Sequence, residues 1–284
     1  MSTKVDIRTI ITDTIIQGLE DGKIPWVRPW EGRRSGGAIN HFTKKYYRGL
    51  NQVILSFVAV SNGWENRWAT FKAMSAHGLK VKKGEHGTPV AFFKFITKED
   101  DDGTEETFPM LRYYRVFSIS QLEEVPVIEA EPVKEFTPIE QAENIIHGYA
   151  ELPPLKLGGD KAYYIARTDE IHLPFKEQFK AEGEFYSTYF HEIAHSTGHP
   201  KRLARKSLIE RDETSYGLEE LIAEFTSAFL CAEAGIEKVI QNQTAYIQNW
   251  LAVLKDNRQM LFTASSQAQK ATDYVLGVSF TQDK

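Results

Sequence analysis

The sequence predicts an α+β protein made of two domains, and three observations lead to this prediction. Residues 1–122 carry 18 Lys and Arg against 13 Asp and Glu, whereas residues 123–284 carry 16 against 26, within a formal net charge of −5. The stretch 123–138 is rich in Pro and Glu, which is typical of an extended linker. Both halves combine helical periodicity with strand-like runs. We therefore expect an N-terminal domain over 1–122, a linker over 123–138 and a C-terminal domain over 139–284.

The composition is that of a globular chain without a membrane segment. Of the 284 residues, 42% are hydrophobic, which is enough to bury a sizeable core. No charged-then-apolar leader opens the sequence, and the longest apolar stretch, residues 53–60, is far too short to cross a bilayer. The single cysteine, Cys231, excludes an internal disulfide and is expected to be a small core residue. We expect a cytoplasmic protein with no membrane partner.

The N-terminal half is predicted to begin with a helix and to contain a pair of strands. Residues 5–19 have the apolar spacing of an amphipathic helix that ends near Gly22. Residues 80–87 are typical of a basic turn, and the runs 90–96 and 112–117 are typical of paired antiparallel strands. This half is therefore expected to form an α+β domain.

Cationic and aromatic side chains alternate along the same half, in residues 25–30, 44–51 and 68–72. Basic side chains neutralise phosphates and flat rings stack on unpaired bases, so this composition favours single-stranded over duplex nucleic acid. The alternative for each tryptophan is burial in the core. The candidate DNA-binding residues are Trp26, Arg28, Trp30, Arg33, Arg34, Lys44, Lys45, Tyr47, Arg48, Trp68, Lys72, Lys80, Lys82 and Lys83.

The C-terminal half contains an HExxH motif at residues 191–195. On a helix, His191 and His195 lie on one face and can bind one zinc ion, while Glu192 reaches a water bound beside them. Gly198 and Pro200 follow as helix stoppers. The motif predicts a zinc site late in a helix, and another divalent metal is compatible with the same residues.

The third metal ligand is predicted to come from further along the chain. In the longer HExxHxxGxxH pattern a third histidine would fall at position 201, where this chain has Lys201. His199, with Pro200 behind it, is better explained as a loop histidine. Residues 218–230 instead form an amphipathic helix that stacks Glu220 and Glu224 one turn apart. These two acids are the candidate ligands, unless they are solvated acids on an ordinary surface helix.

The spacing from Glu220 to Glu224 is similar to the third-ligand helix of gluzincin-type peptidases. That resemblance implies that Glu220 binds the metal and that Glu224 orients a ligand histidine. The helical wheel places Glu224 closer to the apolar stripe, so Glu224 remains an alternative ligand.

The chain as a whole resembles the ArdC family of plasmid- and phage-borne anti-restriction proteins. The resemblance is carried by Pro25-Trp26, Pro29-Trp30, residues 47–51, Trp68 with Thr70-Phe71, residues 81–85, Val116-Phe117 with Gln121, and residues 191–200 and 219–224. The family pairs an N-terminal single-stranded-DNA-binding domain with a C-terminal zincin-like metallopeptidase domain. It implies a protein of a mobile element that protects incoming DNA, with a protein of the host restriction system as a candidate target.

The resemblance to zincins also implies roles for individual residues. Glu192 would act as the general base, and Tyr216 and His199 are candidate donors to an oxyanion. Residues 162–166 are expected to form a strand that pairs with an extended peptide, or an ordinary core strand. Two other functions remain open: a non-enzymatic protein that coats single-stranded DNA around a structural metal site, and a replication-associated DNA-binding protein.

Overall fold

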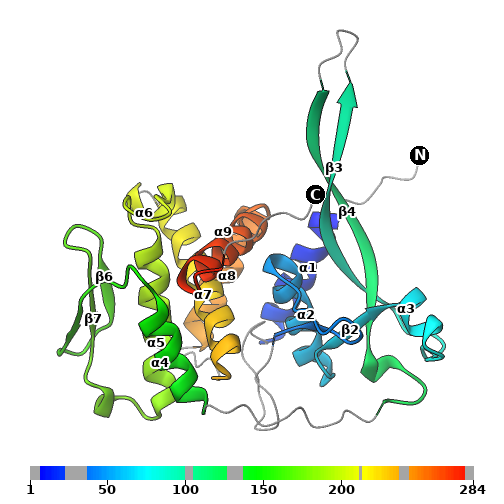
Figure 1. The fold of residues 1–284 in the computed structure, drawn as a ribbon, viewed down its shortest axis with the longest axis horizontal. Coiled ribbons are helices and arrows are strands. Elements are labelled where there is room, and N and C mark those ends of the chain that lie inside the picture. The colour runs from blue at the N-terminus through cyan, green and yellow to red at the C-terminus, as the bar shows by residue number, and fades with distance from the viewer. Residues whose placement is uncertain are drawn as a thin grey trace.

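The computed structural model describes residues 7–22, 37–99, 105–126, 137–210, 213–236 and 243–278 (Figure 1). Five of the candidate DNA-binding residues, Trp26, Arg28, Trp30, Arg33 and Arg34, lie outside the described residues. So do residues 127–136 of the predicted linker.

Helices and strands occur in both halves of the chain, and the last described elements, α5 to α9, are all helices. The helices are α1 (Ile7–Glu20), α2 (Gly49–Asn62), α3 (Phe71–Ala76), α4 (Pro138–Gly148), α5 (Glu182–Thr197), α6 (Lys206–Ile209), α7 (Glu213–Ala234), α8 (Gln243–Asp256) and α9 (Met260–Val275), with 3₁₀ turns η1 (Ile119–Gln121) and η2 (Lys176–Gln178). The strands are β1 (Ile39–Asn40), β2 (Arg67–Thr70), β3 (Thr88–Glu99), β4 (Glu105–Ser118), β5 (Leu155–Leu157), β6 (Tyr163–Ile165) and β7 (Glu170–Leu173). The α+β class expected from the sequence is confirmed.

The N-terminal half is built on a four-stranded sheet with the order β1-β2-β4-β3. Strands β3 and β4 form a long antiparallel hairpin that rises well above the body of the molecule (Figure 1). Its register places Val90 opposite Tyr114, so the strand pair predicted for 90–96 and 112–117 is confirmed. The helix predicted over 5–19 is α1, and Gly22 follows it with a positive φ of 74°.

Trp68 is a core residue, which corrects the expectation that it contacts DNA. It lies in β2 and is fully buried in the same core as Val90 and Val116. Its Nε1 donates to Oδ1 of Asn66 at 2.8 Å, so the polar atom of the ring is satisfied inside the protein. A nucleobase therefore has no face of this ring to stack on.

The C-terminal half joins a small sheet to a group of packed helices. The sheet has the order β5-β7-β6, with β6 antiparallel and β5 parallel to β7. Helix α5 packs against this sheet on one side and against α7 on another (Figure 1). Aromatic residues of α5, among them Phe185, Tyr189 and Phe190, fill the core of this half.

Helix α7 belongs to the cores of both halves. Its apolar stripe, predicted from the sequence, packs with α1, α2, α8 and α9; it consists of Leu218, Leu221, Ile222, Phe225 and Phe229. Farther along the helix, Leu230 and Cys231 are buried in the other core, as expected for the cysteine. The halves also meet through Arg48, which pairs with Asp273 of α9 at 2.5 Å. The two domains are thus joined by a shared apolar interface, and their exact limits in the chain remain a prediction.

Across the described ranges, none of the helices combines the length and the apolar character that crossing a membrane requires.

Candidate metal centre

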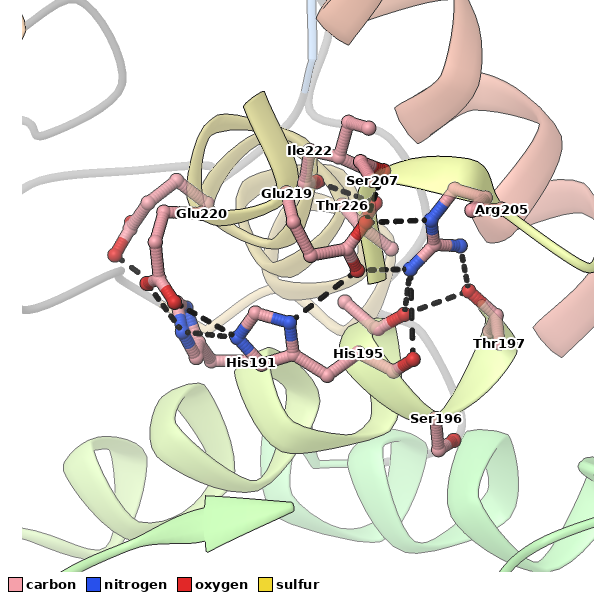
Figure 2. Close-up of polar contacts among 12 residues, drawn as sticks. His191, His195, Ser196, Thr197, Arg205, Ser207, Glu219, Glu220, Ile222 and Thr226 are labelled. Atoms are coloured by element: carbon pink, nitrogen blue, oxygen red, sulfur yellow. Dashed lines mark hydrogen bonds and ion pairs between the residues drawn. The ribbon is translucent and has the colours of Figure 1, made fainter. Parts of the chain in front are cut away.

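The two motif histidines lie one turn apart on the face of α5 that meets α7. The opposite face of α5 holds the large apolar side chains, so packing of Phe190 and Ile193 into the core turns His191 and His195 toward α7. The two Nε2 atoms are 3.1 Å apart, and the rings are nearly perpendicular (Figure 2). Both rings therefore point the same nitrogen at one position.

Glu220 of α7 points its carboxylate at the same position. Its Oε2 lies 3.6 Å from Nε2 of His191, and its Oε1 lies 3.5 Å from Nε2 of His195 (Figure 2). The ligand atoms of these three residues all lie within 4.8 Å of one another. The structure thus brings together the three residues that the sequence proposed as ligands.

The other nitrogen of each histidine faces a separate carboxylate. Nδ1 of His191 is 3.4 Å from Oε1 of Glu224, and Nδ1 of His195 is 3.3 Å from Oε1 of Glu219. A carboxylate at Nδ1 favours the proton there, which leaves the lone pair of Nε2 directed at the central position. Three carboxylates of α7, those of Glu219, Glu220 and Glu224, therefore face the nitrogen atoms of the two rings.

Glu219 is itself held by a buried network that was not predicted from the sequence. Arg205 donates from Nη2 to Oε1 at 2.5 Å and from Nε to Oε2 at 3.0 Å, and Ser207 Oγ donates to Oε2 at 2.6 Å (Figure 2). Both Arg205 and Glu219 are buried. The hydrogen bonds from His195 and Arg205 outweigh burial and lower the pKa of Glu219 to about 2. The network of hydrogen bonds therefore favours the ionised form of Glu219 at neutral pH.

Arg205 also forms hydrogen bonds with the C-terminal end of α5. Its guanidinium donates to the carbonyl oxygen of Ala194 at 2.7 Å and to Oγ1 of Thr197 at 2.5 Å. A Cβ at Gly198 would lie 2.8 Å from Nη2 of Arg205. Glycine at position 198 therefore leaves room for the guanidinium. This packing explains the glycine without the third histidine of the longer HExxHxxGxxH pattern.

Glu192 is a buried carboxyl group beside the histidines. Burial is the main cause that raises its pKa, and the positive charge that His191 and His195 can carry opposes this rise. The pKa of His191 is raised to about 10, because Glu220 and Glu224 outweigh the effect of burial. Several carboxylates thus surround one position, an arrangement that a cation would stabilise.

Tyr216 lies beside this position, whereas the hydrogen bond described for His199 is within the loop after α5. Tyr216 is 65% exposed and is one helical turn before Glu220. The negative charge of Glu220, followed by burial and a hydrogen bond to that carboxylate, raises the pKa of Tyr216. His199 is in the loop after α5, where its Nδ1 accepts from the backbone amide of Lys201 at 3.2 Å. Of the two candidate donors, Tyr216 is thus the one with a described contact to the carboxylate cluster.

The strand expected over 162–166 is β6, and it lies at the edge of its sheet. It pairs with β7 through residues 163–165 and packs beside α5 (Figure 1). Tyr163 stacks on His172 of β7 with 4.8 Å between ring centres. The edge of β6 is therefore close to the helix that carries the motif.

The candidate DNA-binding residues within the described part differ in how they are placed. Arg48 is engaged with Asp273, as described above, and Tyr47 is partly buried, with burial the main cause that raises its pKa to about 12. The exposed lysines are Lys44, Lys45, Lys72, Lys80, Lys82 and Lys83. Among the described residues of this half, five exposed aromatic side chains are not on that list of candidates: Tyr46, Phe71, Phe92, Tyr113 and Tyr114.

Two family models match the chain, one in each half. Residues 5–117 match the N-terminal domain of anti-restriction factor ArdC, and residues 140–267 match a zincin-like metallopeptidase. A protein called DNA primase TraC, from Escherichia coli, is 32% identical over 97% of this chain. The chain spans 20% of that relative and 26% of a second Escherichia coli protein of the same name.

Two crystal structures of antirestriction ArdC protein from the R388 plasmid have the same fold. The metal-free structure aligns with a TM-score of 0.78 and 30% identity, covering 97% of this chain and 100% of the other. The Mn(II)-bound structure aligns with a TM-score of 0.76 and 31% identity, covering 96% of this chain and 97% of the other. The chain belongs to the ArdC family of antirestriction proteins, with an ArdC-type N-terminal domain and a zincin-like C-terminal domain.

Proposed function

We propose that this protein protects the DNA of a mobile element from restriction, that it binds single-stranded DNA, and that His191, His195 and Glu220 hold a divalent metal in a hydrolytic site. The observation that carries the metal assignment is the convergence of two imidazole Nε2 atoms and one carboxylate on a single position. Family membership supports the anti-restriction role, and relatives named for a plasmid and for a DNA primase support a setting in which DNA is single-stranded.

The donor set fits a divalent metal. Ligand atoms about 2.0–2.2 Å from a tetrahedral zinc ion lie about 3.3–3.6 Å from one another. Here the two Nε2 atoms are 3.1 Å apart, each Nε2 lies 3.5 or 3.6 Å from a different oxygen of Glu220, and one ligand atom from each residue falls within 4.8 Å of the others. Two imidazoles and a carboxylate suit zinc and also manganese, and the related R388 protein has a Mn(II)-bound structure. We therefore propose a divalent metal, with zinc as the first candidate.

Three protein ligands distinguish this arrangement from a closed structural site. Structural zinc sites use four protein ligands, usually with cysteine, whereas hydrolytic sites use three and leave one position open. Cys231 is buried in a separate core cluster. This difference favours hydrolysis over the alternative of a purely structural metal.

Each nearby side chain has a role in peptide hydrolysis that its position allows. A bound divalent ion would supply Lewis acidity to a carbonyl group and to the attacking water. Glu192 takes the proton of that water and returns it to the leaving amine, a task for which a buried carboxyl with a raised pKa is suited. The Tyr216 hydroxyl, beside Glu220, donates to the developing oxyanion. The β6 edge pairs with the extended substrate backbone.

The proposed target is a protein that meets the same DNA, such as a component of the host restriction system. DNA held by the N-terminal half raises the local concentration of any protein bound to that DNA. The resemblance to TraC favours one alternative, in which the ArdC-like unit serves replication or transfer of the element and not protection. Association with a primase would favour that alternative.

The test compares wild type with Glu192→Gln in recipient cells that receive unmodified plasmid DNA. The substitution preserves the volume of a buried side chain and removes the base. We expect metal content and DNA binding to stay unchanged and protection to be lost. The matched control is Glu233→Gln, an exposed acid on α7. Full protection by Glu192→Gln would contradict a catalytic role and favour DNA coating.

A further inference from the structure

The N-terminal sheet presents a row of aromatic side chains on the face turned away from the core. Along β4, Val116 points into the core shared by both halves, and so does Val90 of β3. Because successive side chains of a strand point to opposite faces, Tyr113, Arg115 and Phe117 point to the other face. Tyr113 is 57% exposed. We call Tyr113, Arg115, Phe117 and the adjoining Phe71 the outer stripe.

The residues of β3 that lie opposite the outer stripe are small, and the stripe ranges from partly exposed at Phe117 to exposed at Tyr113. The register places Ala91 opposite Tyr113 and Pro89 opposite Arg115, with Gly87 just before the strand. A Cβ at Gly87 would lie 3.0 Å from the ring of Phe117 and 3.0 Å from Cβ of Arg115. The absence of a side chain at Gly87 therefore lets the ring of Phe117 lie close to the backbone just before β3. The rings of the outer stripe then project beyond the small side chains of β3.

Phe71, Phe117 and Arg115 of the outer stripe are held in place by contacts with one another or with the backbone. Phe71, which begins α3 and is 57% exposed, meets Phe117 edge to face with 6.1 Å between ring centres. Arg115 donates from Nη1 to the carbonyl oxygen of Gly87 at 2.7 Å, which ties its guanidinium to the sheet. Preordered rings and a fixed cation lose little conformational freedom when a ligand binds.

Exposed lysines lie on α3 and on the segments that pack against it, next to the end of the outer stripe at Phe71. Lys72 follows Phe71 on α3 and is exposed. A small core cluster packs α3 against the turn containing Phe42 and the loop containing Leu79 and Val81. These segments carry the exposed lysines Lys44, Lys45, Lys80, Lys82 and Lys83. Exposed rings beside a group of cations are complementary to a chain that has stacked bases and a phosphate backbone.

We propose that the outer stripe is the surface on which unpaired bases of single-stranded DNA stack, with the surrounding lysines neutralising the phosphates. This inference rests on the proposed function, namely that the protein binds single-stranded DNA. In a duplex the faces of the bases are covered by their neighbours, so a stacking surface of this kind selects single strands. Aromatic side chains on the open face of a four-stranded sheet are used in this way by RNA-recognition domains.

Helix α3, which carries Phe71 of the outer stripe, and helix α5, which carries His191 and His195, lie toward opposite ends of the molecule (Figure 1). Helix α3 marks one end, and strands β6 and β7, beside α5, mark the other (Figure 1). DNA on the outer stripe would therefore leave the metal centre accessible to a protein bound farther along the strand.

The test measures fluorescence anisotropy of a labelled oligothymidylate with the full chain. Tyr113→Ala and Phe71→Ala are each expected to weaken binding about 5- to 150-fold, the range for loss of one stacked base. Tyr113→Phe keeps the ring and should bind like wild type. Lys72→Gln should reduce the dependence of log affinity on log salt by about 0.7. The matched control is Phe175→Ala, which removes an exposed aromatic side chain of the C-terminal half.

The outcomes separate this inference from the function on which it rests. If wild type binds the oligothymidylate and Tyr113→Ala binds equally well, the outer stripe is not the site, although single-strand binding stands. If wild type does not bind, the proposed function itself fails. Phe71→Ala loses a contact with Phe117, so Tyr113→Ala decides the matter if Phe71→Ala does not fold. Equal affinity of wild type for duplex and single strand would also overturn stacking.

Discussion

Replacing Glu219 with glutamine should weaken metal binding even though Glu219 is not a proposed ligand. Oε1 of Glu219 accepts hydrogen bonds from Nδ1 of His195 and Nη2 of Arg205. Its Oε2 accepts from Nε of Arg205 and Oγ of Ser207. Whichever way the glutamine amide is oriented, its nitrogen cannot accept, so two of these four donors lose their acceptor. Loss of the carboxylate behind a ligand histidine typically costs about 10- to 100-fold in metal affinity.

The same substitution should also lower the stability of the metal-free protein. Arg205 is buried, and removing the charge of its partner leaves an uncompensated cation, which costs about 3–5 kcal/mol. At about 2–4 °C per kcal/mol, the midpoint of thermal unfolding should fall by roughly 6–20 °C. The double variant Arg205→Met, Glu219→Leu removes both charges and should recover much of that stability. It should not recover metal affinity, because His195 still lacks its carboxylate.

Two assays separate these effects. Metal affinity is measured by competition with a chromogenic chelator, for zinc and for manganese, and stability is measured by thermal unfolding in the presence of a chelator. Glu233→Gln, at an exposed position of the same helix, serves as the control. Unchanged metal affinity in Glu219→Gln would refute the argument that this carboxylate orients His195.

Two further predictions concern the same centre. Glu220→Ala should weaken metal binding more than Glu224→Ala, because only Glu220 faces both Nε2 atoms, and isothermal titration that gives the reverse order would exchange the two roles. Gly198→Ala should destabilise the protein by about 1–3 kcal/mol, because its Cβ would meet a guanidinium that Glu219 and Thr197 hold in place. Gly148→Ala, where no atom lies within 4 Å of the added Cβ, is the control, and equal unfolding midpoints for the two variants would refute the steric argument.

Local patterns in the sequence were sufficient to predict α5, α7 and their facing polar residues. The i, i+4 spacing of His191 and His195 fixes their common face on any helix, and the apolar stripe of α7 fixes which face is left for acids. The role of Glu219 was not predictable in this way. The role of Glu219 depends on Arg205, which lies in the segment that connects α5 and α7. Arg205 contacts Glu219 because this segment folds back between the two helices.

Burial of Trp68 shows a second limit of sequence patterns. A short strand with aromatic and basic residues is compatible with either face turned inward, and the choice depends on pairing between β2 and β4, which lie far apart in the sequence. The register turns Trp68 toward the core and leaves Tyr113 outside.

The apolar core that the two halves share could not be predicted from the composition of the chain. The charge difference between the halves indicates two domains, but charge reports on surfaces and not on apolar contacts. Residues of α1 and α2 pack with α7, α8 and α9. A fragment that ends near Gln121 would expose these apolar faces, so DNA binding is best measured on the full chain.

The most direct test of the metal assignment is the metal content of the purified protein, measured by mass spectrometry after removal of loosely bound ions. Because two imidazoles and one carboxylate converge on a single position, we expect about one divalent ion per chain in wild type and loss of that ion in the His191→Ala, His195→Ala double variant. Stoichiometric metal retained by the double variant would contradict the assignment.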